Sequence, residues 1–113
     1  MTKSELSELL KTLDVPVNEG ITSSENINIY PRIIYWPFAE QDEMASGGGY
    51  NNLVTYQISF YARTPQHEKY KEIRERLREI GLHPLFNHEY VENDPVFANS
   101  WHTYFALDVI EDV

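Results

Sequence analysis

The sequence of 113 residues contains no cysteine, few basic side chains and no long apolar run. The absence of cysteine excludes disulfides and zinc sites built from thiolates. A membrane-spanning helix needs about 20 apolar residues in succession, and no stretch of this chain approaches that length. The N-terminal segment MTKSELSELLKTLD also lacks the apolar core of a signal peptide. We therefore expect a soluble protein that is made in the cytoplasm.

Basic side chains are outnumbered two to one, because 9 lysines and arginines face 18 aspartates and glutamates, which gives a net charge of −9. A nucleic-acid-binding domain normally has a basic surface and a positive balance. Six of the nine basic side chains nevertheless fall within residues 63–79, together with four acidic ones. The composition argues against direct binding of nucleic acid, and it allows the mixed segment of one copy to contact the acidic remainder of another.

Two segments have the apolar spacing of amphipathic helices. Over residues 2–13, four leucines recur at the spacing of one helical stripe, and Thr2 with Glu5 matches a capping box. A second helix is predicted from Thr64 and Pro65 to position 80, with Gly81 as its stop. The apolar stripe of the second helix consists of Tyr70, Ile73, Leu77 and Ile80.

Four segments are rich in β-branched and aromatic residues and predict strands. These segments cover residues 27–38, 53–63, 82–91 and 100–110. The segment 53–63 alternates most clearly, and its Ile58 and Phe60 are expected to face inward, under Ile73 and Leu77 of the second helix. The order helix, strand, strand, helix, strand, strand predicts a single α+β domain over residues 1–113. In this fold an antiparallel four-stranded sheet carries two helices packed on one face.

The segment between the first two strands, residues 40–52, is acidic and contains three consecutive glycines. Glycine loses the most backbone entropy on ordering, and long loops in compact domains tend to be functional. We therefore expect a mobile hairpin loop that contacts a partner protein. The expected contact residues are Asp42, Glu43, Met44, Ser46, Gly47, Gly48, Gly49 and Tyr50 of this loop, with Arg74 and Arg78 of the second helix.

Three patterns that carry chemistry in other proteins were weighed and do not fit well. Three histidines and Glu89 fall on the last two predicted strands, but His83 and His88 are five positions apart and would point to opposite faces of one strand. Asp42 and Glu43 sit in a glycine-rich loop, where nothing fixes a general acid or base. The glycine run leads into a strand and lacks the lysine of a phosphate-binding loop. The sequence predicts no catalytic residue, no metal site and no cofactor.

The segment RIIYWPFAEQDEMASGGGYNNLVTYQISFYARTPQHEKYKEIRERLREIG resembles the central part of small neck proteins of long-tailed bacteriophages, the tail-completion or tail-terminator group. The points of likeness are a strand that leads into an acidic, glycine-containing loop, a strand of the YQISFYAR kind, and a helix opened by Thr-Pro. The likeness extends over residues 32–110 and includes the order of helices and strands.

The resemblance implies a structural protein of a phage or a prophage. Proteins of this group form rings, usually of six copies, at the end of the tail tube that meets the head. The implied partners are other copies of the chain and neighbouring tail-tube or head-completion proteins, with no cofactor, no membrane and no small-molecule substrate. The implied location is the bacterial cytoplasm during assembly and then the neck of the virion. The long hairpin loop is expected to become ordered on assembly.

Other functions fit parts of the same sequence. A head–tail connector or a minor capsid protein would belong to the same particle. An acidic inhibitor or DNA mimic would explain the net charge of −9 equally well, and a small hydrolase that uses the histidines is the enzymatic alternative. The genes on either side distinguish these functions, because portal, capsid and tail-tube genes would surround a neck protein.

Overall fold

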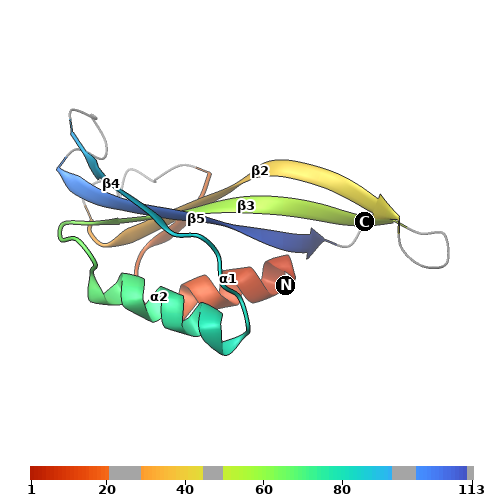
Figure 1. The fold of residues 1–113 in the computed structure, drawn as a ribbon, viewed down its shortest axis with the longest axis horizontal. Coiled ribbons are helices and arrows are strands. Elements are labelled where there is room, and N and C mark those ends of the chain that lie inside the picture. Colours follow the sequence, from red (N-terminus) through yellow and green to blue (C-terminus); the bar gives the residue numbers. More distant parts are fainter. Residues whose placement is uncertain (21–28, 45–49, 93–98, 112–113) are drawn as a thin grey trace.

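The computed structural model describes residues 1–20, 29–44, 50–92 and 99–111. Within these residues the chain forms two helices and one sheet of five strands (Figure 1). The helices are α1 (Lys3–Lys11) and α2 (Glu68–Glu79), and the strands are β1 (Val17–Glu19), β2 (Arg32–Met44), β3 (Tyr50–Ala62), β4 (Asn87–Val91) and β5 (Ser100–Glu111). No helix among the described residues has the length and apolar character that crossing a membrane requires.

Helix α1 forms where the leucine stripe and the cap predicted it. The hydroxyl oxygen of Thr2 accepts a hydrogen bond from the backbone N–H of Glu5 at 3.2 Å, which satisfies one of the free donors of the first turn. Leu6 and Leu10 are buried against the sheet, and Leu13 follows them just after the helix. The predicted capping residue is confirmed, and three of the four leucines of the predicted stripe are buried, whereas Leu9 is half-buried.

Helix α2 begins three positions later than the Thr-Pro pair predicted. Its N-cap is His67, whose ring Nδ1 accepts from the backbone N–H of Lys69 at 3.0 Å. Gly81 lies at a φ of +80°, where glycine is favoured, and its N–H donates to the carbonyl of Arg78 at 3.0 Å. The predicted glycine stop is therefore confirmed, whereas the predicted start is wrong because a histidine ring replaces threonine as the cap.

The sheet differs from the prediction in the number and direction of its strands. Its strand order is β1-β2-β3-β5-β4, and β1 pairs in parallel with β2 while the other neighbours pair antiparallel. The prediction of four antiparallel strands is thus wrong in detail, although the α+β class is confirmed. A three-residue strand has no periodicity to detect, and its pairing depends on the chain returning to the edge of β2.

Both helices lie on the same side of the sheet (Figure 1), and the core lies between the helices and the sheet. Ile58 and Phe60 of β3 are buried on this face together with Ile73 and Leu77 of α2, as predicted. The remaining helix residue of the predicted stripe, Ile80, is 53% exposed. Ile80 is the C-cap of α2 and lies one residue beyond the helix.

The hairpin between β2 and β3 is longer than predicted and its loop is correspondingly shorter. Strand pairing continues from Glu40 opposite Val54 to Met44 opposite Tyr50, so most of the predicted loop over 40–52 consists of paired strands. Backbone hydrogen bonds hold such a ribbon, and its exposed side chains need not be apolar. The central part of the predicted loop, residues 45–49, lies outside the described residues.

Candidate interaction surfaces

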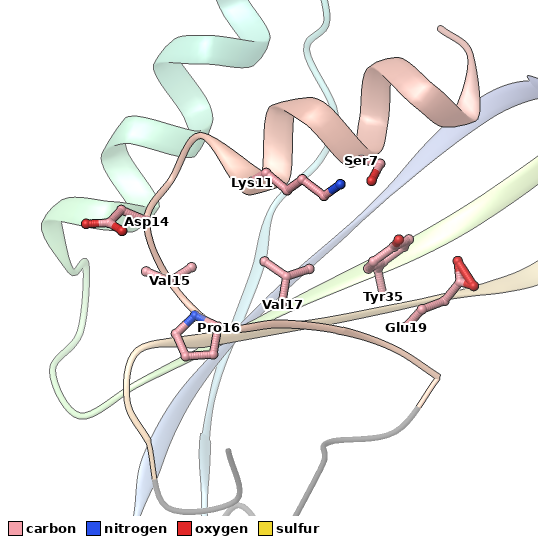
Figure 2. Close-up of a pocket in the computed structure, with 8 residues that line it drawn as sticks. All are labelled: Ser7, Lys11, Asp14, Val15, Pro16, Val17, Glu19 and Tyr35. Carbon is pink, nitrogen blue, oxygen red and sulfur yellow. The ribbon is translucent and has the colours of Figure 1, made fainter. Parts of the chain in front are cut away.

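The structure has a pocket of about 460 Å³ between the end of α1, strand β1 and strand β2 (Figure 2). Lys11, Ser7, Tyr35 and Glu19 are arranged around this space, whereas Asp14 lies at its far side. The ammonium and the two hydroxyl groups can donate hydrogen bonds, and the carboxylate accepts them. The pocket therefore suits a small polar group of either sign rather than one particular ligand.

Two groups at this pocket have raised pKa values, Tyr35 on its lining and Lys3 beside the lining residue Glu19. Burial raises the pKa of Tyr35, and the nearby carboxylate of Glu19 raises it further, so the phenol keeps its proton at neutral pH. A hydrogen bond with Glu19 raises the pKa of Lys3, and the two charged atoms are 3.1 Å apart. A general base must release and accept a proton near the working pH, and neither shifted group moves toward it.

The predicted contact residues of the hairpin are placed on strands rather than on a loop. Asp42 lies on β2, opposite Asn52, and is exposed. The backbones of Glu43, Met44 and Tyr50 belong to the last paired positions of the two strands. Ser46, Gly47, Gly48 and Gly49 fall outside the described residues. The described part of this surface is the two-stranded ribbon of residues 40–44 and 50–54, which we call the acidic ribbon. Within it, the Nδ2 of Asn52 donates to the Oε1 of Glu40 at 3.2 Å.

The other predicted contact residues, Arg74 and Arg78, lie on an exposed side of α2. Together with Lys71 and Glu75 they line a shallow depression of about 250 Å³. Three basic groups and one acidic group make this surface net positive. We call the surface formed by Lys71, Arg74, Glu75 and Arg78 the basic flank.

The structure does not bring the acidic ribbon and the basic flank together within one molecule. The molecule is elongated, with extents of 51 × 28 × 22 Å, and the end of the β2–β3 hairpin and helix α2 lie toward opposite ends of its long axis (Figure 1). The two sets of predicted residues are therefore separate surfaces of opposite charge, each free to contact another molecule.

The histidines are dispersed. His88 hydrogen-bonds through Nδ1 to the hydroxyl of Thr103 at 2.8 Å, on the face that carries the helices. His102 lies on the opposite face of the sheet, since it pairs with Tyr61, and His83 precedes β4. Among the described residues no three histidine, aspartate or glutamate side chains are grouped so that they could hold a metal ion.

The sequence did not predict a cluster of buried side chains on the sheet face opposite the helices. The ring of His102 stacks between Tyr61, at a centroid distance of 4.5 Å, and Tyr104, at 4.8 Å. Arg32 is fully buried beside this stack and lies over the ring of Tyr30 at 4.4 Å. The aromatic residues at the outward positions of β3 and β5 could have indicated this cluster, because the solvent-facing positions of such strands are normally polar.

Acidification is expected to destabilise the protein through His102. Burial lowers the pKa of His102, although its hydrogen bond with Glu89, 2.8 Å from Nδ1, opposes this effect. A histidine whose folded-state pKa lies below its unfolded value of 6.5 stabilises the fold fully above that value, and this contribution is lost as the pH falls below it. Thermal unfolding measured from about pH 7.5 down to about pH 5.5 should show this loss.

Two variants separate this effect from the general titration of acidic groups. His102→Gln should flatten the pH dependence of the melting temperature over this interval, because it removes the buried imidazole. His83→Gln, at an exposed position, should leave the dependence as in the original protein. Identical pH profiles for all three proteins would show that His102 does not contribute to the acid sensitivity.

Comparison of the sequence with protein-family models and with curated proteins gives no match. The functional assignment therefore depends on the surfaces described above and on the resemblance of the central segment.

Proposed function

We propose that this protein is a structural subunit of the head–tail neck of a bacteriophage or prophage. In this role it is a tail-completion or tail-terminator protein that acts through protein–protein contacts. Copies of the chain assemble into a ring, expected to contain six subunits, and the ring contacts tail-tube or head-completion proteins. The subunit has no cofactor and catalyses no reaction.

The presence of a net-positive surface, the basic flank, on a chain that is otherwise strongly acidic carries this proposal. A contact between two different surfaces of identical subunits is heterologous, and successive contacts of this kind close into a ring when the rotation between subunits is suitable. Opposite charges on the two surfaces favour such a contact and oppose pairing of like surfaces. The elongated shape, with the end of the β2–β3 hairpin toward one end and helix α2 toward the other (Figure 1), supports contacts between different surfaces of neighbouring subunits.

The charge of the whole chain also supports a role around DNA without binding to it. A ring through which DNA passes must avoid holding its phosphates, and affinity for DNA rises with the number of phosphates that lysine and arginine neutralise. The chain has a net charge of −9, and its basic residues are concentrated on one helix. An acidic ring would let the duplex move freely.

Inactivation of the gene in the strain that carries it tests the proposal. A stop codon placed early in the gene should leave heads and tails unjoined in electron micrographs of the lysate, with a loss of infectious particles. A plasmid copy of the unaltered gene should restore joined particles. Complete particles in normal numbers without the protein would contradict a role in the neck.

A further inference from the structure

A second surface of α2 faces α1 and forms an apolar groove with it. The groove has a volume of about 300 Å³, and its apolar lining comes from Met1, Leu9 and Ile80. Ile80 is 53% exposed and Leu9 is half-buried. An isoleucine that is exposed at a helix end and adjoins other apolar side chains gains contacts when another surface covers it.

The rim of this groove is acidic. Glu5 and Glu8 of α1 line one side, and Glu79 of α2 lines the other. Among the described residues that line it, Arg76 is the one basic side chain, and it is already paired with Glu72, with Nη2 and Oε1 2.9 Å apart. An occupant therefore meets carboxylates around an apolar floor, which favours a basic surface whose side chains have apolar stems.

The groove and the basic flank lie on opposite sides of α2. Successive residues of an α-helix are rotated by about 100°, so Arg74 and Arg78 lie on one side of the buried stripe while Arg76 and Ile80 lie on the other. Each molecule thus presents a basic flank and an acid-rimmed groove in opposite directions. Two surfaces arranged in this way are complementary between copies and cannot meet within one copy.

We propose that the groove between α1 and α2 binds the basic flank of α2 from a second copy of this chain. This inference rests on the proposed ring and names one of its contacts. The arginine stems of the flank cover Ile80 and Leu9, while the guanidinium groups pair with Glu5, Glu8 and Glu79.

The acidic ribbon is the competing partner for the flank, and the groove fits better. Glu40 and Asp42 are the exposed carboxylates of the ribbon that the structure describes, and Glu40 already accepts a hydrogen bond from Asn52. The groove combines three carboxylates with an apolar floor. Burial of apolar area then adds to charge attraction, which alone is weakened by salt.

The chain has no cysteine, so single introduced thiols report contacts without background. We would place one thiol in the groove (Thr12→Cys, which keeps its apolar floor and its carboxylates), one on the flank (Glu75→Cys, which keeps all its basic residues) and one on the ribbon as a control (Asp42→Cys). Variants carrying tags of different length are mixed in pairs, oxidised and separated on denaturing gels. The flank and groove variants should give the mixed disulfide in roughly tenfold or greater excess over the flank and ribbon variants, because docking raises the effective concentration of two thiols.

The outcomes distinguish the groove contact from the ring itself. A predominant flank–ribbon disulfide would overturn the groove contact and leave the ring standing. An excess of the flank–groove product that persists after Arg74→Glu and Arg78→Glu would overturn the charge pairing proposed here. A chain that gives no cross-link and sediments as a monomer at every concentration would overturn both the groove contact and the ring. Circular dichroism of each variant confirms that it is folded before mixing.

Discussion

Replacement of Leu77 by alanine is expected to lower the free energy of unfolding by about 2–5 kcal/mol, the usual range for a buried leucine. Leu77 has no exposed surface and belongs to the core cluster that joins α2 to the sheet. The truncation removes apolar contacts and leaves a cavity that the β-sheet beneath cannot fill without distortion. Urea denaturation followed by circular dichroism measures the loss as a lower midpoint at an unchanged slope.

The neighbouring Arg76→Ala substitution is the matched control. Arg76 is partly exposed and its ion pair with Glu72 has i, i+4 spacing, and exposed pairs of this kind contribute about 0.3–0.5 kcal/mol. The control should therefore lose less than about 1 kcal/mol. Equal losses from the two substitutions would mean that the buried side of α2 is assigned incorrectly.

Reversal of charge on the basic flank is expected to weaken association between copies strongly while leaving the fold intact. The double variant Arg74→Glu, Arg78→Glu places two acids opposite an acidic partner surface, whether groove or ribbon. Like charges brought together at an interface cost several kcal/mol, so the dissociation constant should rise roughly 100-fold or more. Both side chains are exposed, and the melting temperature of the monomer should change little.

Sedimentation velocity over a range of concentrations measures this effect. The control is Lys11→Glu, on the α1 side of the pocket in Figure 2. It changes the net charge by the same amount as the single variant Arg74→Glu, with which it should be compared. If Lys11→Glu weakens association as much as Arg74→Glu does, net charge rather than the basic flank governs assembly.

Local signals in the sequence correctly indicated a large part of the fold. Four features were predictable because each depends on residues close together in the sequence. They are the leucine stripe and the Thr2 cap of α1, the inward face of β3, and the glycine stop of α2. The start of α2 escaped prediction, since His67 is an unusual cap and Thr64 with Pro65 matched the commoner pattern. The parallel strand β1 escaped as well, because its three residues pair only after the chain has folded back.

The sequence by itself determined the α+β class, the acidic balance and the concentration of basic residues on one helix, because composition and periodicity contain that information. Only the tertiary structure decided how these features are distributed in space. It extended the hairpin into an acidic ribbon, buried Arg32 and His102 on the face without helices, and placed α1 beside α2 so that Ile80 lines a groove. These properties arise from contacts between segments far apart in the chain, and no local pattern of residues specifies which distant segment will lie alongside.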